Sequence, residues 1–438
     1  MVKDKIILHI DMNSYFASVE QQANPHLRGK SVSVCAYLSP KGCIIASSME
    51  AKLKGIQTGC LAYQAQELDP QVVLVQNDPA KYRTVTKKIF QILSEYTTDL
   101  ETYSIDEAFL DITELIKVKK EGKMNKAKGM NVNLDFKLAK EIGQEINFRI
   151  KSEIGSWLKS SIGISRTRFL AKLLSDNGPK DSAMIKDLHE IPEFIKNLEL
   201  TDIWGINWRM QLRLQKFNIY TPLDLYQSQA HQLLQDLKKP GYYLWAGLHG
   251  IKAGPSRLAR SSGEAGSFKT QDNPKSVGHS YCLSKQTTDK EYLARILMKL
   301  CEKTGRRLRE LEFDASAVSV YWSYVGGGHG GKSKRLYAPI YESWDIFKQA
   351  WQPLQDLDLP GKVRMLAVSV SSFVPRTRQL NLFRPVEIKE NKKYSLSRAL
   401  DEVNNKYGEF TLIRGSMWNT GDNAPDRIGF RKTVSWKE

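Results

Sequence analysis

The sequence predicts a multidomain α+β protein, and three observations support this prediction. The chain has 438 residues, which is enough for about two to four domains. Hydrophobic residues make up 41% of it and aromatic residues 10%, a composition that can build packed cores and that excludes a disordered chain. Strand-like runs and helical periodicities alternate along the chain, and no strand–helix–strand unit repeats.

The first predicted elements place an acidic residue at the end of a buried strand. Residues 6–10 form a short apolar run, and Asp11 follows it directly. Asn13 or Ser14 then offers the N-cap of an amphipathic helix. Residues 31–75 mix short strand-like runs with a short helix, which predicts a small α+β lobe.

A second acidic pair lies between β-rich segments. After a helix near 79–96, the run 102–110 brackets Asp106 and Glu107 as a turn would. The remaining elements predicted in this half are a helix near 135–152, a strand at 160–165 and a basic helical stretch from Arg166.

Two segments have the composition of a loop and a linker. Residues 117–134 are rich in lysine and contain Gly and Asn, so we expect a loop whose charges are solvated. Residues 252–276 carry Gly, Pro and Ser and predict a linker to a separate domain that begins near Val277.

The last domain should be a small basic α/β module. Thr288 and Glu291 fit a capping box before a helix with an apolar face. Alternating strands at 318–324 and 365–373 flank a glycine-rich hairpin tip. Such a module could lie along a phosphate backbone with its cationic residues, which are Arg306, Arg307, Arg309, Lys332, Lys334, Arg335, Arg376 and Arg378.

The charge and the cysteines restrict the setting. The net charge is +17, which indicates a polyanion partner such as nucleic acid, or otherwise a surplus of surface lysine. The five cysteines form no C-x-x-C pair, as expected in a reducing cytoplasm. No apolar run approaches the ~20 residues that cross a bilayer, and the N-terminus lacks a signal-peptide pattern. We therefore expect a cytoplasmic protein with no membrane partner.

Three carboxylates are candidates for a metal site. Asp11, Asp106 and Glu107 follow or precede strands, and carboxylates brought together from separate strands suit Mg²⁺. Two such ions could stabilise the attacking and leaving oxygens of a phosphoryl displacement. The alternative is that these residues are helix caps or surface turns.

Two segments closely resemble the metal-site motifs of the Y-family, translesion DNA polymerases. They are residues 11–20, DMNSYFASVE, and residues 103–111, YSIDEAFLD. The resemblance continues in residues 162–165, 169–173 and 424–430 and so covers nearly the whole chain. It implies a right-hand polymerase fold, with a palm, small fingers, a helix-hairpin-helix thumb and a little-finger domain.

The resemblance also implies roles for residues of the palm. Asp11, Asp106 and the carbonyl of Met12 would hold two Mg²⁺ ions, for which Mn²⁺ could substitute, with Glu107 beside them. Adjacent strand residues face opposite ways, so Asp106 and Glu107 need a turn or bulge to reach one site. Phe16 matches the steric gate that rejects a ribose 2′-OH, although an aromatic residue on an amphipathic helix can also be core.

Several residues would contact the triphosphate of the incoming dNTP. By resemblance they are Tyr15, Tyr82, Arg83 and Lys172. The fingers carry Ala46, Met49 and Lys52 where DNA polymerase IV types have Thr, Tyr and Arg, a pattern closer to the catalytic subunit of DNA polymerase V. Lys52 keeps a charge without a bidentate fork, and Ser47 or Ser48 could supply a hydroxyl instead.

Two more segments resemble binding elements of the family. Residues 198–219 look like a helix-hairpin-helix, in which Gly205 and Asn207 would meet DNA phosphates and Asn207 and Asn218 replace the usual glycines. Arg306 and Arg335 would contact DNA from the little finger. Residues 379–383, QLNLF, look like a sliding-clamp-binding peptide that uses Gln379, Leu380, Leu382 and Phe383, or else form a terminal strand.

The expected organisation follows from these motifs. It comprises a palm at 1–22 and 76–172, fingers at 23–75, a thumb at 173–245, a linker at 246–276, a little finger at 277–384 and a C-terminal tail at 385–438. The expected activity is low-fidelity, template-directed DNA synthesis on primed template DNA, without a proofreading domain. The alternatives are a catalytically weak DNA-binding scaffold that depends on accessory subunits, and a palm-type enzyme making cyclic or oligonucleotide signals.

Overall fold

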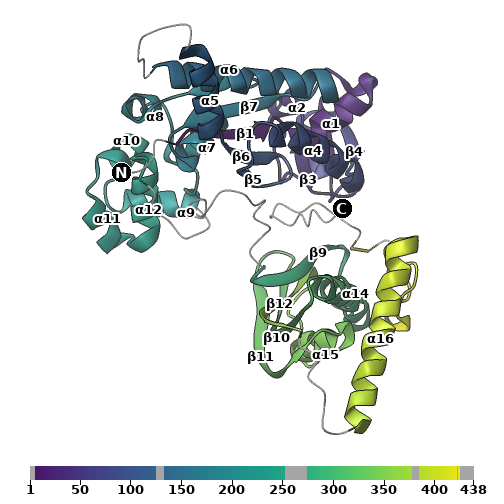
Figure 1. Cartoon of the computed structure of the whole chain (residues 1–438). Helices are drawn as coiled ribbons and strands as arrows, with labels where there is room; N and C mark the ends of the chain where they lie inside the picture. The colour runs from purple at the N-terminus through teal and green to yellow at the C-terminus, as the bar shows by residue number, and fades with distance from the viewer. Residues whose placement is uncertain (1–4, 125–132, 252–273, 377–383, 422, 425–438) are drawn as a thin grey trace. The chain divides into compact units, whose positions relative to one another are not determined.

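The protein consists of two compact units, built from residues 1–270 and 271–426 (Figure 1). The structure is a computed structural model that describes residues 5–124, 133–251, 274–376, 384–421 and 423–424. The predicted linker core at 252–273, the peptide at 379–383 and the motif residues from 425 onward lie outside the described residues.

A five-stranded sheet organises the first unit, with strand order β5-β6-β1-β7-β8. Strand β1 lies at its centre and pairs antiparallel with both β6 and β7. The strands are β1 (Ile7–Met12), β5 (Leu100–Thr102), β6 (Glu107–Asp111), β7 (Ser160–Ser165) and β8 (Ala183–Ile185). Strands β1 and β7 are buried along nearly their whole length because helices cover both faces of the sheet.

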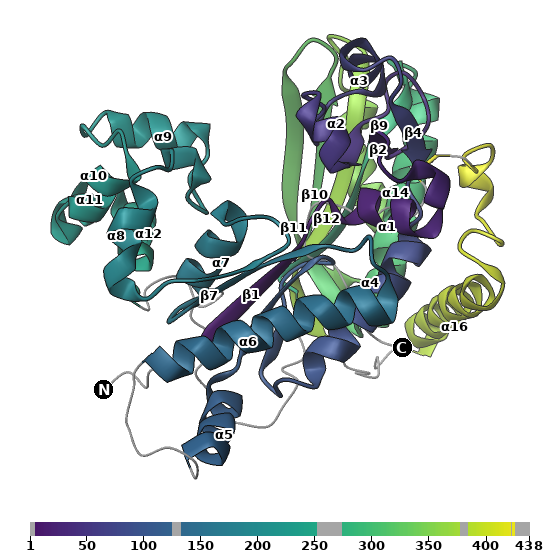
Figure 2. The ribbon, with the colours of Figure 1, turned by 90° about the horizontal axis from the view of Figure 1, so that it is seen from above.

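Strand alternation assigns the side chains of β1 to two different layers. Leu8 and Ile10 join a core with helices α4 (Pro79–Ser94) and α6 (Asn133–Arg149), whereas Ile7 and His9 face helix α7 (Arg168–Asn177) (Figure 2). Gly163 of β7 allows α7 to approach closely, because a Cβ there would lie 2.0 Å from the carbonyl oxygen of Ala171.

A small lobe follows the first strand. Helix α1 (Tyr15–Ala23) leads through the turn η1 (Pro25–Leu27) into a three-stranded sheet of order β3-β2-β4. The strands are β2 (Val32–Cys35), β3 (Ile44–Ser47) and β4 (Val73–Gln76), and the helices are α2 (Met49–Leu53) and α3 (Ala62–Leu68). This lobe has its own small core around Ile44 and Ile56.

Short helices form a third part of the first unit. They are α8 (Ile191–Ile195), α9 (Trp208–Gln215), α10 (Pro222–Gln227), α11 (Ala230–Asp236) and α12 (Lys238–Leu248), with the turns η3 (Leu188–Glu190) and η4 (Leu200–Asp202). Their core includes Leu170 and Leu173 of α7, so this part is packed directly onto the helix that covers the large sheet.

The second unit is a four-stranded antiparallel sheet with helices on one face. The strand order is β11-β10-β12-β9, and helices α14 and α15 supply the core residues that pack against it. The elements are β9 (Ser276–Thr287), α14 (Lys290–Glu310), β10 (Phe313–Tyr324), β11 (His329–Ile340), α15 (Ser343–Gln355), β12 (Val363–Pro375), α16 (Arg384–Tyr407) and η5 (Gly415–Met417). The N-cap of α14 is Asp289 and not Thr288 as predicted.

One expectation about secondary structure is wrong, namely the loop at 117–134. Residues 117–124 belong to helix α5 (Thr113–Met124), and only 125–132 of the expected loop lie outside the described residues. Ion pairs such as Lys120–Asp135 (2.9 Å) attach this lysine-rich helix to α6, so its charges do not prevent helix formation. The expected palm limit at residue 172 falls inside α7, and β8 beyond it still pairs with β7, while α12 extends past residue 245 to Leu248.

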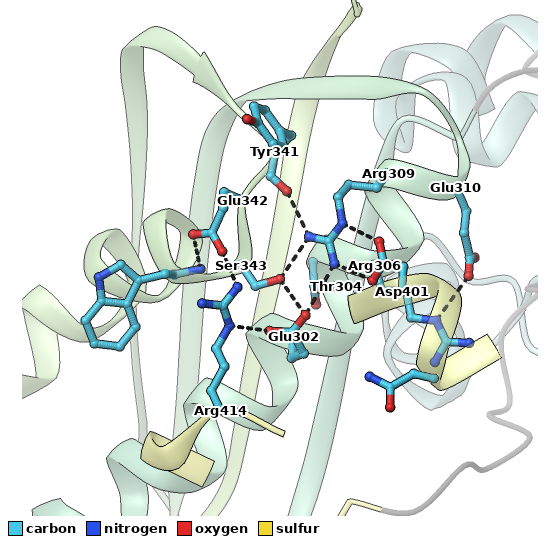
Figure 3. A network of polar contacts seen from close by, with 12 residues as sticks. Glu302, Thr304, Arg306, Arg309, Glu310, Tyr341, Glu342, Ser343, Asp401 and Arg414 are labelled. Carbon is cyan, nitrogen blue, oxygen red and sulfur yellow. Dashed lines mark hydrogen bonds and ion pairs between the residues drawn. The ribbon is translucent and has the colours of Figure 1, made fainter. Parts of the chain in front are cut away.

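Helix α16, which lies in the expected C-terminal tail, is packed onto the second unit. Arg309 of α14 donates from Nε and from a terminal nitrogen to both carboxylate oxygens of Asp401 on α16 (2.6 and 2.8 Å) (Figure 3). The same guanidinium contacts Glu302, whose other oxygen accepts a hydrogen bond from Arg414 (3.0 Å). Residues that follow the sheet in sequence therefore complete a buried ionic network within the unit.

Replacing Asp401 with Ala should loosen α16 from the unit. The change leaves the buried Arg309 guanidinium without its bidentate partner, and breaking such a pair costs about 3 kcal/mol. Hydrogen exchange of the α16 amides should rise accordingly. The matched control is Glu402→Ala on the same helix, whose exposed pair with Arg398 is worth about 0.5 kcal/mol or less. Equal exchange in the two variants would contradict an anchoring role for the network.

Candidate active site

Strand pairing brings the three predicted carboxylates together. The register of β1 with β6 places Asp11 directly opposite Glu107. Asp106 lies in the bend just before β6, and its carbonyl accepts a hydrogen bond from the Met12 N–H (3.0 Å). The bend supplies the change of direction that consecutive strand residues need in order to face one site.

The turn between β1 and α1 is held from several sides. Ser14 has φ 50°, in the left-handed region, and sits at the N-cap position of α1 without making a side-chain cap bond. The neighbouring Asn13 receives hydrogen bonds from Ser161 Oγ (2.9 Å) and from Ser18 Oγ (2.7 Å). A strained residue that its surroundings fix in this way is typical of functional sites.

Burial and mutual repulsion make two of the carboxylates weak acids. Burial, followed by the charges of Asp106 and Glu107, raises the pKa of Asp11 well above its usual value. Burial also raises the pKa of Asp106, although its carboxylate accepts a hydrogen bond from Ser104 Oγ. A cation placed between these groups would relieve the repulsion, so the donor set suits a divalent metal ion.

Glu107 differs because cationic and polar groups already surround it. Burial alone would raise its pKa, but His9 and Lys172 hold it below the usual value. Lys172 Nζ lies 3.1 Å from a Glu107 oxygen, and His9 Nε2 lies 3.6 Å from the same atom. Within the described part of the chain, no three acidic, His or Cys side chains stand ready to hold one ion.

The sequence missed a fourth acidic residue at this site. Asp176 lies 3.2 Å from Lys172 Nζ, one helical turn further along α7, and its charge acts on both Asp11 and His9. Burial lowers the pKa of Lys172, but Asp176 and Glu107 more than compensate and raise it. The i, i+4 spacing of Lys172 and Asp176 was a signal that could have revealed this pair.

The aromatic residues beside the site divide into core and half-buried positions. Tyr15 is buried, and its hydroxyl lies 2.9 Å from the Tyr82 carbonyl and 2.7 Å from Thr86 Oγ1. Tyr82 is buried too, and its hydroxyl donates to Glu20. The hydroxyl groups of Tyr15 and Tyr82 thus bond within the core, and the predicted triphosphate contact of these residues stays a prediction. Phe16 is half-buried next to them.

The small lobe supplies one cation near the carboxylates. Burial of its ammonium group and the charge of Lys180 lower the pKa of Lys52, while Asp11 acts in the opposite direction. Ser47 and Ser48 are buried. Ser48 caps α2 by accepting from the Ala51 N–H (3.3 Å), so neither serine is placed to replace a triphosphate contact. Arg83 is half-buried on α4.

The two asparagines of the predicted hairpin differ: Asn218 is left-handed as expected, and Asn207 is the N-cap of a helix. Gly205 has φ +98° and Asn218 has φ +58°, as left-handed positions require. Asn207 is extended, contrary to expectation, and is the N-cap of α9 because its side chain accepts from the Met210 N–H (2.9 Å). Both Gly205 and Asn207 are exposed.

The two arginines predicted to bind DNA have different surroundings. Arg306 forms an ion pair with Glu310 (3.4 Å) and donates a hydrogen bond to Asn405 of α16. Its guanidinium group therefore has partners within the second unit. Arg335 is exposed on β11 opposite Ala317, in the row next to the Ser319–Ser333 pair. By strand alternation, this row lies on the face away from the core of α14 and α15.

Comparison with known proteins shows the family to which the chain belongs. Residues 10–176 match the impB/mucB/samB family, and residues 274–382 match the C-terminal domain of that family. A protein from Bacillus anthracis is 30% identical over 425 residues, covering 95% of this chain and 94% of the relative. The chain therefore belongs to the Y-family of DNA polymerases.

Individual relatives show which members of this family the chain resembles. The Bacillus anthracis protein is named DNA polymerase IV, as is a Bacillus velezensis protein that is 29% identical and covers 95% of this chain and 94% of its own. A chimeric Y-family DNA polymerase of solved structure has a TM-score of 0.69, with 20% identity, over 85% of this chain and 100% of its own. The first unit is thus the polymerase core and the second the little-finger domain.

The expected closeness to DNA polymerase V has no support. The relatives that this chain matches over nearly their whole length are named DNA polymerase IV. The fingers residues that suggested otherwise form one short helix and the strand before it, so they are a local difference.

Within the described residues, no helix is long and apolar enough to cross a membrane.

Replacing Asp11 with Asn should stabilise the metal-free protein. A neutral amide removes the repulsion with Asp106 and Glu107, and we expect about 0.5–2 kcal/mol more unfolding free energy near neutral pH. Because the folded pKa exceeds the unfolded value near 3.8, the wild-type penalty grows as pH rises through the raised pKa. The two proteins should converge below that range.

Denaturant unfolding in a chelator at several pH values measures this difference. The control is Asp176→Asn, which should gain less, because it breaks the favourable pair with Lys172. Wild-type stability that stays parallel to the Asp11→Asn curve at every pH would contradict the raised pKa.

Proposed function

We propose that this Y-family polymerase performs translesion DNA synthesis by two-metal nucleotidyl transfer at Asp11, Asp106 and Glu107. The pairing of β1 with β6, which puts Asp11 opposite Glu107 and ties Met12 to Asp106, is the observation that carries the proposal. The primer 3′-OH would attack the α-phosphate of a paired dNTP on a primed template and release pyrophosphate.

The residues fit two Mg²⁺ ions, or Mn²⁺ in their place. Asp11, Asp106, the Met12 carbonyl and Glu107 would hold them, because hard cations prefer oxygen ligands. When bound, the ions supply Lewis-acid stabilisation of the charge that develops on the attacking and leaving oxygens. The chain contributes a half-buried carboxylate cluster whose mutual repulsion bound cations would relieve.

Lys172 has two partners in this proposal. It neutralises Glu107 and Asp176 in the metal-free site, at 3.1 and 3.2 Å. Cations at the carboxylates would compete with it for Glu107, and the freed ammonium group would then meet the triphosphate together with Lys52, Lys180 and Arg83. Positive groups there favour the transition state because negative charge moves onto the leaving pyrophosphate.

Two surfaces would hold DNA. The exposed turn at Gly205 and Asn207 presents backbone N–H groups at the start of α9, which suits a phosphate of the duplex. On the little finger, Arg335 adjoins small hydroxyl residues that lie side by side across β11, β10 and β12, namely Ser333, Ser319 and Ser369. A flat hydroxyl surface with a cationic edge can follow a backbone without reading sequence.

Asp106→Ala should abolish primer extension and leave primed-template binding within about twofold. Removing one carboxylate of the cluster removes a metal ligand, whereas the DNA surfaces lie on other elements. Extension assays with Mg²⁺ and with Mn²⁺, beside DNA binding in chelator, measure both properties. The control is Asp99→Ala, an exposed carboxylate just before β5 that takes no part in the cluster. Retained extension by Asp106→Ala would refute the metal assignment, whereas a wild-type protein that binds primed template without extending it would indicate a DNA-binding scaffold.

We further propose a sliding clamp as partner, bound through residues 379–383. The support is the sequence QLNLF and its position between β12 and α16, two elements that are both attached to the little finger. Deleting Gln379–Phe383 should spare distributive synthesis and remove stimulation by a clamp. Stimulation that survives the deletion would reject this site, and a requirement for accessory subunits would show as inactivity of the isolated wild-type protein.

A further inference from the structure

The ring of Phe16 rests on a buried tyrosine. Its ring and that of Tyr82 are stacked, with centroids 4.4 Å apart and planes 13° apart. Phe16 is half-buried, while Tyr82 has no exposed surface. One face of the Phe16 ring therefore has a fixed neighbour, whose own position determines how far the ring can tilt.

Tyr82 is in turn anchored by a buried charge. Its hydroxyl donates to Glu20 Oε1 at 2.8 Å, and Glu20 is only 4% exposed. Lys81 Nζ binds both oxygens of the same carboxylate, at 3.0 and 2.8 Å. Lys81 also lies 3.8 Å from Asp78, the N-cap of α4. The carboxylate thus has a cation and a neutral donor as partners, as buried charges require.

The positions of these residues on α1 and α4 make the arrangement rigid. Phe16 and Glu20 are four residues apart, on one face of α1. Tyr82 spans that face, because its ring meets Phe16 while its hydroxyl meets Glu20. The Tyr82 carbonyl also accepts from Tyr15, so both ends of the residue are held. A single side chain therefore fixes the distance between α4 and two successive turns of α1.

We propose that Glu20 and Tyr82 are positioning residues that set the discrimination between deoxyribonucleotides and ribonucleotides by holding the Phe16 ring. This inference rests on the proposed function and on the resemblance of Phe16 to the steric gate, by which Phe16 would meet the sugar of the incoming nucleotide. A ring excludes a 2′-hydroxyl only if it cannot tilt away from it, and shifts below about 1 Å are enough to change such contacts. The anchored Tyr82 supplies the resistance that a half-buried ring lacks.

Sugar discrimination by the full-length protein tests the inference. The measured quantity is the ratio of kcat/KM for dCTP to that for CTP, each opposite a template G. Tyr82→Leu removes the stacked ring and should lower the ratio by about two- to tenfold. Tyr82→Phe keeps the ring but loses its anchor, so its effect should be smaller. Glu20→Gln keeps an acceptor for the hydroxyl and should change the ratio least.

A matched control separates positioning from general stability. Tyr96 is also a buried tyrosine whose hydroxyl donates to a carboxylate, Glu145, at 2.9 Å, and it lies beyond the far end of α4. Tyr96→Phe should lower the melting temperature and leave the dCTP to CTP ratio unchanged. Equal ratios in Tyr82→Leu, Tyr82→Phe and Tyr96→Phe would overturn the inference.

Phe16→Val distinguishes this inference from the function on which it rests. If Phe16→Val loses discrimination while the Tyr82 variants keep it, the gate stands and the positioning role fails. If Phe16→Val keeps full discrimination, the assignment of Phe16 itself fails. Loss in Phe16→Val together with a graded loss across Tyr82→Leu, Tyr82→Phe and Glu20→Gln supports both.

Discussion

The antiparallel pairing of β1 with β6 is the constraint on which the rest of the structure depends. Its register leaves Asp11 facing Glu107, and the bond from Met12 to Asp106 closes the group. Carboxylates held this close in a buried position repel one another and lose hydration. The flanking layers must therefore be stable enough to hold them, and apolar residues of β1, α4, α6 and α7 provide that stability.

The repulsion among the three carboxylates is offset more at Glu107 than at Asp11 and Asp106. Glu107 has Lys172 and His9 beside it, which lower its pKa. Burial and the neighbouring carboxylates instead raise the pKa values of Asp11 and Asp106. Charge is thus left uncompensated at the two residues that the family resemblance assigns to metal binding.

Structural features that depend on local sequence patterns could be predicted from the sequence. The apolar run before Asp11 and the β-rich flanks of Asp106 gave the strands and therefore the carboxylate site. It could not show that Tyr15 and Tyr82 turn their hydroxyls into the core, because that depends on Thr86 and Glu20 in other elements. It also could not show that α16 docks, because Arg309 and Asp401 are 92 positions apart.

Buried carboxylates serve opposite purposes in the two kinds of site found here. Glu20 and Glu302 are surrounded by donors, and each ties together elements that apolar contacts alone would let slide. Asp11 is half-buried with like charges for neighbours, which raise its pKa. The contrast explains why the Glu20 network can lie within one helical turn of Phe16 without competing for metal ions. The charge of Glu20 is already neutralised by Lys81, whereas the repulsion among Asp11, Asp106 and Glu107 is left for a cation to relieve under the proposed function.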